Sequence, residues 1–385
     1  MYLILSLLFA VGLIADGNFN SSHICKSCHP LIYKEYFDSM HRRSSIFNDP
    51  VHKAVWDLHP LKKRGRYSCA KCHTPSDTKL MEALKSGKTA LPKENDIQLQ
   101  EPIGCTYCHR IENIKKGSKS NINIISDKER YYFAAKNGKN EESVIKYHKS
   151  SDMMGFGKKG IGSPFHTIDY SNPNFSNGKI CIGCHEFKKN SKGLDVCAMD
   201  FERSEKSDTN CITCHMPQVN GPISTLTSEK SHAFHGFAGL HNSPKMLAKY
   251  IKLKIVPADE TIAVSIKNEA DHRLFAHPLR VAQLRVTVIR DGKSFTLPAV
   301  SFYRILGKES RPAMPWEATE VLKEYSLEAH DTKRLEFNFK TESGDLIEAT
   351  LGYYIVNPKA AKKLGLQDSK ESSFKTLVTQ KMQIK

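Results

Sequence analysis

Apolar residues follow two different periods along the chain, and the change falls near residue 250. Beyond that point they recur at every second position in two runs, which contain Ile262, Val264 and Ile266, then Leu284, Val286 and Val288. Alternation with a period of two is typical of strands that bury one face. The later segment "RLEFNFKTESGDLIEATLGYYIV" alternates on both sides of Ser343 and Gly344, which predicts a hairpin. We therefore expect a β-sandwich-like C-terminal domain over residues 250–385.

Before residue 250 the pattern favours helices separated by polar loops. The segment "HPLIYKEYFDSMH" gathers apolar residues on one side of a helix that would run from His29 to His41. Polar stretches such as "IENIKKGSKSNINIISDKER" separate the apolar segments. The sequence therefore predicts a mainly α domain with little regular β structure over residues 17–245.

The N-terminus begins "MYLILSLLFAVGLIAD", with an apolar stretch of about thirteen residues that is too short to span a bilayer. Its length is typical of the core of a secretory signal peptide, and small residues near Ala15 allow cleavage. A basic n-region is missing, so an uncleaved anchor and a misassigned start remain alternatives. We predict a signal peptide over residues 1–16 and no transmembrane helix after its removal.

The number and grouping of the cysteines narrow the kinds of site that the chain can form. Hydrophobic residues make up 39% of the chain, below the roughly 45–50% of ordinary globular proteins, so the side chains alone predict a thin core. All but one of the 11 cysteines fall into Cys-x-x-Cys pairs, namely Cys25/Cys28, Cys69/Cys72, Cys105/Cys108, Cys181/Cys184 and Cys211/Cys214. A disulfide scaffold would scatter its cysteines through a short chain, so this grouping does not fit one.

A histidine directly follows every pair, at His29, His73, His109, His185 and His215. Cys-x-x-Cys-His is the attachment signature of a c-type haem. On a helical turn the two thiols can each add to one vinyl group of the porphyrin, and the adjacent imidazole becomes the proximal ligand of the iron. Zinc gives no reason for a histidine after each pair, and thioredoxin-like sites would each need a strand–helix context. We expect five covalently bound haem c groups.

Five haems also account for the composition. Porphyrins are large apolar bodies, and they can form the core that the side chains do not. The formal net charge of +16 would suggest a nucleic-acid or membrane-surface partner, but about ten haem propionates would offset much of it. We therefore expect no nucleic-acid partner. Thioether attachment of haem, together with the signal peptide, predicts a bacterial periplasmic location.

The sixth ligands of the irons must come from histidines outside the motifs. A continuous helix from His29 to His41 would rise about 18 Å, whereas two imidazole nitrogens on one iron lie about 4 Å apart. His41 is therefore predicted to reach the iron of a neighbouring haem. The candidate distal ligands are His41, His148, His166, His232 and His241.

Several further residues carry weaker expectations. His52, His59, His272 and His277 are additional ligand candidates, and the last two lie on a loop that could face the haem domain. For Met153 and Met154 we expect packing rather than ligation. The lone Cys197 is expected to be an inert small apolar residue, with a reactive role as the alternative.

The motifs, with "CHPLIYKEYFDSMH", "CITCHMP" and "SHAFHGF", resemble those of bacterial periplasmic multihaem cytochromes c. The similarity is to the cytochrome c-554-like group, which is related to hydroxylamine oxidoreductase and the octahaem reductases. It covers residues 17–245 and implies closely packed haems with bis-histidine ligation that includes His41 and His232. The C-terminal part is similar to β-domains that follow such haem regions, although "DHRLFAHPLR" departs from their Gly-His…Pro-Thr-Gly loop.

The first functional expectation is an electron carrier in anaerobic respiration, with no catalytic residues of its own. It would pass electrons between redox protein partners, a quinol-side donor and a terminal reductase, and it could form a homo-oligomer. The alternative is a reductase of nitrite, hydroxylamine or a sulfur oxyanion at one open haem. Pentahaem nitrite reductases mark their active haem with a lysine in place of the motif histidine, whereas all five motifs here end in histidine.

Overall fold

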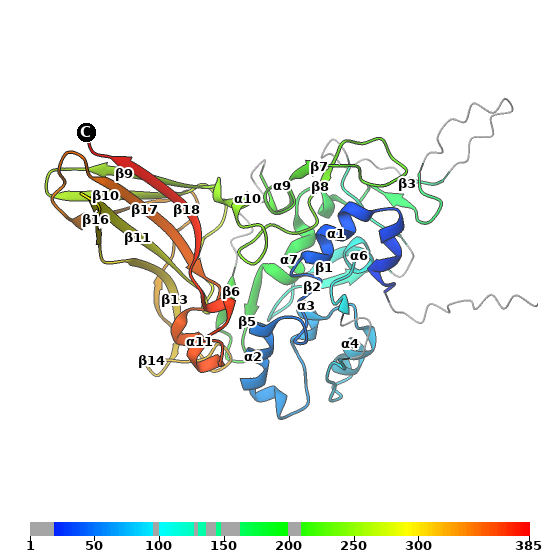
Figure 1. Cartoon of the computed structure of the whole chain (residues 1–385). Helices are drawn as coiled ribbons and strands as arrows, with labels where there is room; N and C mark the ends of the chain where they lie inside the picture. The colour runs from blue at the N-terminus through cyan, green and yellow to red at the C-terminus, as the bar shows by residue number, and fades with distance from the viewer. Residues whose placement is uncertain (1–18, 95–99, 127–129, 136–143, 148–161, 199–208) are drawn as a thin grey trace, which may run out of the picture.

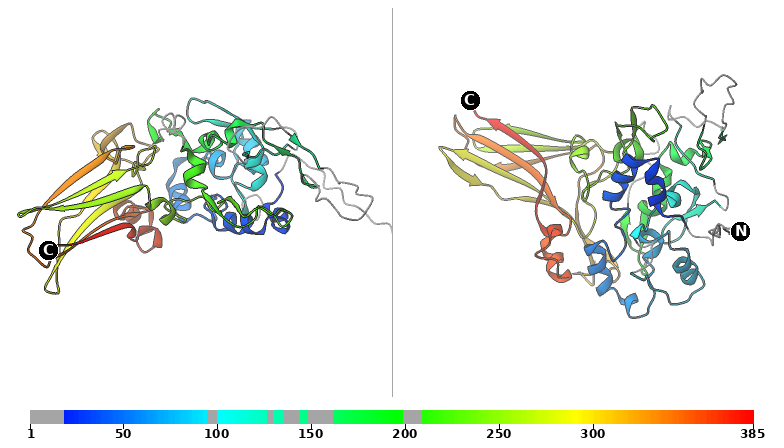
Figure 2. Two further views of the ribbon diagram at one scale, coloured as in Figure 1. Left: turned by 90° about the horizontal axis from the view of Figure 1, so that it is seen from above. Right: turned by 45° about the vertical axis from the view of Figure 1, so that its right-hand side comes forward.

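The structure of the chain is a computed structural model, which describes residues 19–94, 100–126, 130–135, 144–147, 162–198 and 209–385. The predicted signal peptide lies outside the described residues. Figure 1 shows two parts: a motif region, which carries all five Cys-x-x-Cys-His motifs, and a β region formed by the C-terminal strands. Figure 2 shows the same arrangement from two further directions.

The motif region contains short helices joined by long irregular segments. Four of them form around the attachment motifs: α3 (Ala70–His73), α6 (Cys105–His109), α7 (Ile182–His185) and α9 (Cys211–His215). The other α-helices among the described residues of this region are α1 (Pro30–Asp38), α2 (Pro50–Leu58), α4 (Thr78–Lys85) and α10 (Lys245–Ala248). The single helix predicted from His29 to His41 is wrong, because α1 ends at Asp38 and Ser39 is extended.

Small two-stranded sheets also occur in the motif region, and they overturn the predicted mainly α class. They pair β1 (Ile111–Lys115) with β2 (Ile122–Ile125), β3 (Val144–Ile145) with β4 (Ile168–Asp169), β5 (Phe187–Lys189) with β6 (Asp195–Ala198), and β7 (Gln218–Asn220) with β8 (Ser231–Ala233). Helix makes up 23% and strand 31% of the structure. These small sheets provide hydrogen-bond partners for the backbone N–H and C=O groups of polar connecting segments. The side chains of such segments have no clear periodicity, so the sequence pattern does not predict these strands.

The expected C-terminal β-rich region is present and consists of two sheets. The smaller has the order β16-β10-β9, with β9 (Ile251–Pro257), β10 (Thr261–Asn268) and β16 (Thr332–Asn338). The larger has the order β14-β13-β11-β17-β18, and β12 and β15 pair with β11 and β13. Its strands are β11 (Val281–Arg290), β12 (Lys293–Thr296), β13 (Val300–Lys308), β14 (Arg311–Pro312), β15 (Glu320–Tyr325), β17 (Leu346–Tyr354) and β18 (Lys375–Gln383).

The alternating residues of both sheets point into one shared core. The predicted inward positions of β10 and β11 are fully buried, at Ile262, Val264, Ile266, Leu284, Val286 and Val288. Asp291 and Gly292 connect β11 to β12 with positive φ angles of 49° and 74°, as the primed hairpin turns require. The period-two pattern therefore identified these strands correctly.

The hairpin predicted around Ser343 and Gly344 is wrong. Strand β16 pairs with β10, whereas β17 pairs with β11 and β18 in the other sheet. Phe337 and Ile347 still face the same core, but from opposite sheets. Two consecutive alternating strands bury the same residues whether they pair directly or face each other across a core, so alternation alone could not separate the two arrangements.

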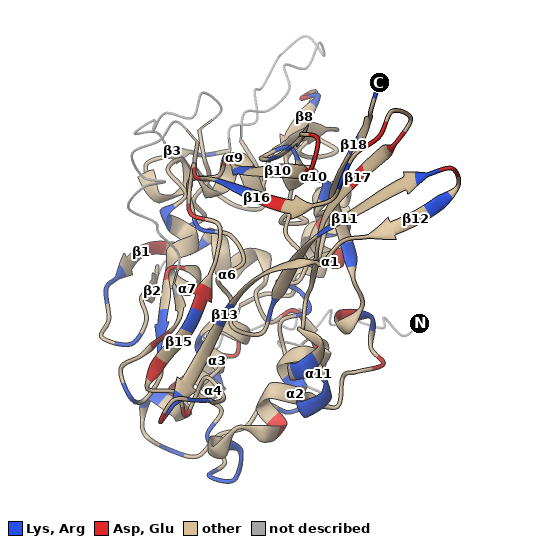
Figure 3. Ribbon diagram, turned by 90° about the vertical axis from the view of Figure 1, so that its left-hand side faces the viewer, with Lys and Arg blue, Asp and Glu red and all other residues tan. Residues whose placement is uncertain are grey.

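The two parts of the chain pack against each other. Val51, Ala54 and Val55 of α2 lie on the core of the β region, next to α11 (Pro358–Leu364). The side-chain amide of Asn190 donates to the carbonyls of Pro315 (2.8 Å) and Ala318 (2.7 Å). Lys and Arg residues occur on many elements of the molecule, including α11 (Figure 3). Within the described residues, no helix combines the length and apolarity that crossing a membrane requires.

Candidate functional site

Each attachment motif forms a tight helical turn, which places its two thiols on one side. In the first two motifs the backbone N–H of the histidine donates to the backbone carbonyl of the first cysteine, from His29 to Cys25 (2.8 Å) and from His73 to Cys69 (3.0 Å). Helices α6 and α9 span the whole of motifs three and five. All the motif cysteines are free and partly exposed. This is the local geometry that thioether attachment to one porphyrin needs.

We number the sites 1 to 5 by the motifs in chain order. Thiols of different motifs lie within hydrogen-bond reach of each other: Cys25 with Cys105, Cys72 with Cys184, and Cys181 with Cys211. Asn123 donates both to the hydroxyl of Tyr107 in motif three (3.0 Å) and to Sγ of Cys184 in motif four (3.8 Å). Site 1 therefore adjoins site 3, and site 4 adjoins sites 2, 3 and 5.

The predicted attachment residue Cys214 of motif five has a different kind of neighbour. Its Sγ accepts a hydrogen bond from the hydroxyl of Thr213 (4.0 Å) and lies within hydrogen-bond reach of the hydroxyl of Tyr250. This contact with the thiol, followed by burial, raises the pKa of Tyr250 to about 12. The sequence did not predict the contact, because Tyr250 directly precedes β9, far along the chain from the motif. Attachment of haem at Cys214, as at the other motif cysteines, stays a prediction.

Each motif histidine faces a second histidine from a distant segment. The ring centroids of four pairs are separated by 6.3 Å in His29–His166, 6.4 Å in His109–His235, 6.0 Å in His185–His41 and 6.1 Å in His215–His272. A metal–imidazole nitrogen bond is about 2 Å and a ring nitrogen lies about 1 Å from the ring centre, so two imidazoles on opposite sides of one metal have centroids about 6 Å apart. The four pairs fit a single iron between them.

Hydrogen bonds orient most of these rings. Nδ1 of His29, His109 and His215 lies 2.8, 2.8 and 2.6 Å from the carbonyls of Ile223, Tyr132 and Ala238. Their partners bond carbonyls in the same way: His166 to Thr167 (3.1 Å), His235 to Ala233 (2.7 Å) and His272 to Arg273 (3.1 Å). A carbonyl acceptor fixes the proton on Nδ1 and leaves Nε2 as the metal-binding nitrogen.

Burial favours the neutral form of six of these imidazoles, which is the form that binds a metal. It lowers the pKa of His41 to about 3 and those of His109 and His235 to about 4. The pKa values of His166, His185 and His272 are also lowered, chiefly by burial. Within the described residues, no three His, Cys, Asp or Glu side chains converge as a zinc site would require. The donors meet as histidine pairs beside cysteine pairs, and this set fits a haem iron.

Site 2 differs from the other four. The ring centroids of His73 and His52 are only 3.9 Å apart. Both rings share one acceptor, because the carbonyl of Ser44 lies 2.9 Å from Nδ1 of His52 and 3.1 Å from Nδ1 of His73. The hydroxyl of the fully buried Tyr67 lies 3.3 Å from Nε2 of His52.

The shared acceptor has a geometric consequence. Two nitrogens that bond one oxygen at these lengths are at most about 6 Å apart, whereas Nδ1 atoms of imidazoles bound through Nε2 on opposite sides of one metal are about 8 Å apart. His52 and His73 therefore cannot both bind one iron while both bond the carbonyl of Ser44. One of these hydrogen bonds must break before site 2 matches the others.

The predicted distal candidates fall into three groups. His41 and His166 lie opposite motif histidines, as the pairs above show. His232 instead contacts Glu35, with its Nε2 3.1 Å from Oε1. Burial, followed by the charge of Arg280, lowers the pKa of His241 to about 3, and within the described residues His241 is not paired with a motif histidine. His148 lies outside the described residues, as do Met153 and Met154.

Of the weaker candidates, His52 and His272 join motif histidines, whereas His59 and His277 do not. His59 packs on Trp316 and Trp56, and burial and then Arg280 lower the pKa of His277 to about 3. The sequence reasoning did not single out His235, although "SHAFHGF" places it three residues after His232. Burial raises the pKa of the Cys197 thiol, as expected for an unreactive cysteine.

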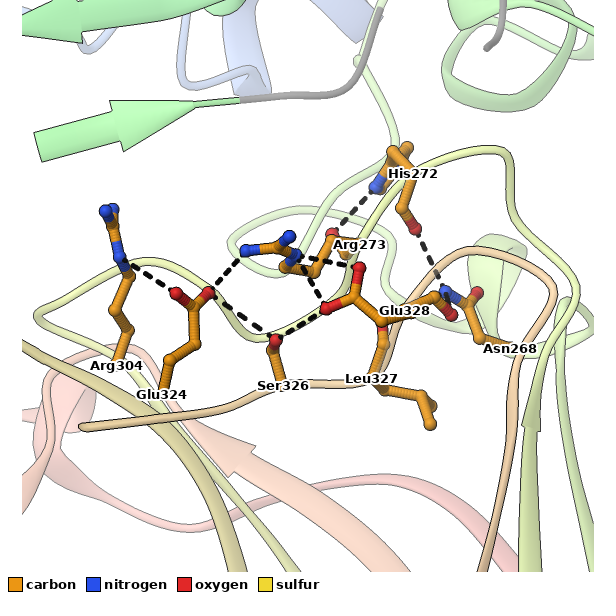
Figure 4. Close-up of polar contacts among 8 residues, drawn as sticks. All are labelled: Asn268, His272, Arg273, Arg304, Glu324, Ser326, Leu327 and Glu328. Atoms are coloured by element: carbon orange, nitrogen blue, oxygen red, sulfur yellow. Dashed lines mark hydrogen bonds and ion pairs between the residues drawn. The ribbon is translucent and has the colours of Figure 1, made fainter. Parts of the chain in front are cut away.

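The β region contributes His272 to site 5 from the loop between β10 and β11 (Figure 4). The amide of Asn268 donates to the carbonyls of His272 (2.9 Å), Leu327 (3.3 Å) and Glu328 (2.9 Å). Arg273 donates to Glu324 (2.6 Å) and Glu328 (3.0 Å). These bonds join the loop to the end of β15 and to the segment after it. The position of His272 is therefore fixed by the β region.

Two comparisons with known proteins found similarities to this chain. Residues 24–110 match the family described as cytochrome c554 and c-prime, a segment that includes the first three motifs. The fold is similar to that of a penta-heme cytochrome c552 from Thermochromatium tepidum, with a TM-score of 0.68 and 21% identity over 95% of this chain and 99% of that one.

A further structural match is to a superoxide reductase in the oxidized state, at 12% identity over 28% of this chain and 79% of that one. Its TM-score of 0.18 is too low to indicate a shared fold. No match was found among curated protein sequences. The first three motifs therefore lie in a segment similar to this cytochrome family, and nearly the whole chain has a fold similar to that of the penta-heme cytochrome.

Proposed function

We propose that this chain is a periplasmic electron-transfer protein with five covalently attached haem c groups. A haem c supplies a one-electron iron couple whose potential is set by its axial ligands and surroundings. The observation that carries the proposal is the set of four histidine pairs with ring centroids 6.0–6.4 Å apart. Two imidazoles per iron leave no coordination position for a substrate, which favours electron transfer over catalysis at these sites.

The chain's own residues would arrange and insulate the centres. Each motif places two cysteines and a histidine on one turn, and carbonyls such as those of Ile223 and Tyr132 hold the rings in orientation. The neighbouring thiols of sites 1 and 3, 2 and 4, and 4 and 5 imply short distances between centres. Electrons would then enter from one redox partner and leave to another along this connected series.

Location and partners belong to the proposal as well. The apolar N-terminal segment and the haem attachment motifs support export to the periplasm. The partners would be a quinol-side donor and a terminal reductase in anaerobic respiration. A relation to hydroxylamine oxidoreductase and the octahaem reductases, and a homo-oligomeric state, stay predictions.

Two measurements test the proposal. Pyridine haemochrome quantitation of the purified protein should give about five haems c per chain. Electron paramagnetic resonance of the oxidised protein should show low-spin ferric signals from sites 1, 3, 4 and 5. Two or fewer haems per chain, or high-spin signals at most sites, would contradict a bis-histidine electron carrier.

A second candidate function is reduction of nitrite, hydroxylamine or a sulfur oxyanion at site 2. The shared bond to the Ser44 carbonyl favours it, because His52 cannot keep this bond and also sit opposite His73 on one iron. His52 and Tyr67 would then line an open side of this centre and offer polar groups to a small ligand. A high-spin signal in the wild-type protein that changes when nitrite or hydroxylamine is added would support it. A low-spin centre at site 2 that ignores both compounds would exclude it.

A further inference from the structure

Glu35 joins two parts of the motif region that are far apart in sequence. It lies in α1, midway between His29 of site 1 and His41 of site 4. One carboxylate oxygen lies 3.1 Å from Nε2 of His232, and the other accepts the backbone N–H of His235 at 2.8 Å. The side chain of Glu35 is 19% exposed and that of His232 is 2% exposed. Both contacts are therefore shielded from water and strengthened by the charge of the carboxylate.

His232 and His235 have different hydrogen-bonding states although they are three residues apart. His232 uses both ring nitrogens, because Nδ1 lies 2.9 Å from the carbonyl of Gly221 and Nε2 contacts Glu35. His235 bonds a carbonyl only through Nδ1, and its ring lies 6.4 Å from that of His109. Among the described residues, none hydrogen-bonds Nε2 of His235. Only His235 therefore has a nitrogen available to a metal.

The contact between Glu35 and His232 is costly to break because it lies away from water. The ring of His232 is held from both sides, since the carbonyl of Gly221 accepts a hydrogen bond from its Nδ1 and Glu35 meets its Nε2. A buried polar group that loses its hydrogen-bond partner costs the free energy of its desolvation.

The hairpin of β7 and β8 is also fastened to site 1. Its loop donates from the N–H of Thr225 to the carbonyl of Cys28 (2.8 Å), and its Ile223 carbonyl bonds Nδ1 of His29 (2.8 Å). Gly221 has a φ of 125°, which a residue with a side chain rarely adopts, and its carbonyl is the one that binds His232. The loop of this hairpin thus rests on site 1, and the chain after β8 reaches site 3.

We propose that Glu35 is a positioning residue that holds His235 opposite His109 at site 3, with His232 as its buried partner and not as an iron ligand. The proposal deepens the proposed function, since it assigns how one distal ligand is kept in place. It also makes α1 a common support: the helix starts at site 1, anchors the ligand of site 3 through Glu35, and leads to His41 of site 4.

The first test compares Glu35→Ala and Glu35→Gln with Asp38→Asn in the full-length protein with its haems. Asp38 is an exposed carboxylate on the same helix, so its variant removes the same charge without touching the hairpin. Glu35→Ala should lose one low-spin signal relative to wild type, and Glu35→Gln should keep it but raise the midpoint potential of one haem. Asp38→Asn should match wild type in spectrum and potential. Identical spectra and potentials for all variants and wild type would overturn the proposal.

The second test separates His232 from His235. His235→Ala should convert one low-spin haem to high spin, and added imidazole should restore the low-spin signal, whereas His232→Ala should retain the wild-type number of low-spin haems. The reverse outcome would show that His232 is the ligand and would overturn the proposal. Haem content by pyridine haemochrome accompanies each variant. A wild-type protein with two or fewer haems would instead contradict the proposed function itself, so the two failures are distinguishable.

Discussion

The motif region and the β region achieve order in different ways. The β region has one large apolar core, built from alternating residues of two sheets and covered by α2 and α11. Among its described residues, the motif region has only small clusters, one around Trp56, Tyr67 and Leu80 and another around Phe19, Tyr107 and Ile111. Its helices are short and its sheets have two strands each. Such pieces are marginal by themselves, so under the proposed function we expect the haems to supply much of the apolar contact in the motif region.

The largest expected effect follows from removing one attachment site. Replacing Cys181 and Cys184 with alanine removes site 4, which adjoins sites 2, 3 and 5. We expect hydrogen exchange measured by mass spectrometry to rise across the motif region, while β11 and β17 keep their protection. Cys197→Ala is the matched control, because this cysteine lies outside the motifs and should leave all five haems attached. Equal loss of protection in both regions would show that the β region depends on the haems too.

The converse change belongs in the β core. Leu284 is fully buried on β11, and Leu284→Ala should lower the free energy of unfolding of the β region by about 2–5 kcal/mol through lost burial and a cavity. The haem content and the low-spin spectrum should stay as in wild type, with a modest exception at site 5, where His272 comes from this region. Urea titrations followed by hydrogen exchange test this. Val321→Ala, at an exposed position of β15, should have little effect.

A smaller effect is expected at the junction of the two regions. Asn190→Ala removes the amide that donates to the carbonyls of Pro315 and Ala318. Leaving the buried carbonyl of Ala318 and the partly buried carbonyl of Pro315 without this donor should cost about 1–3 kcal/mol. Amide hydrogen exchange should become faster in β5, β6 and the segment around Ala318, whereas exchange in the inner strands of both sheets should be unaffected. No change at these segments would mean that apolar packing by α2 alone joins the two regions.

The smallest effect concerns acid stability of the β region. Arg290 donates to both oxygens of Asp345 at 2.7 Å and holds the pKa of this buried carboxyl below its usual range. This pair contributes stability above the unfolded pKa of about 3.9, and the contribution is lost as pH falls through the lower folded value. Asp345→Asn should therefore destabilise the protein at pH 7 and flatten its loss of stability below pH 4. Thermal unfolding measured as a function of pH would show whether the unfolding temperature of the variant depends less steeply on pH than that of the wild type.

Local patterns in the sequence were enough for part of this description. The five motifs predict haem attachment because all the required groups lie within five consecutive residues. Alternation identified β10 and β11 because a strand's inward positions depend only on its own sequence. The same reasoning failed for β16 and β17, whose burial pattern does not say which strand each one pairs with. It also missed the small hairpins of the motif region, which have little apolar signal.

Which histidines come together was decided only by the tertiary structure. His29 meets His166 and His109 meets His235, and between such partners lie more than a hundred residues of chain. "SHAFHGF" offers two histidines of equal chemistry, and the sequence favoured His232. Glu35, a residue of the distant helix α1, contacts Nε2 of His232 and accepts a hydrogen bond from the backbone N–H of His235. The groups of an attachment motif are neighbours in the sequence, so the sequence reveals the motif. A distal histidine must lie opposite a motif histidine and keep a ring nitrogen without another hydrogen-bond partner, and both conditions depend on the tertiary structure.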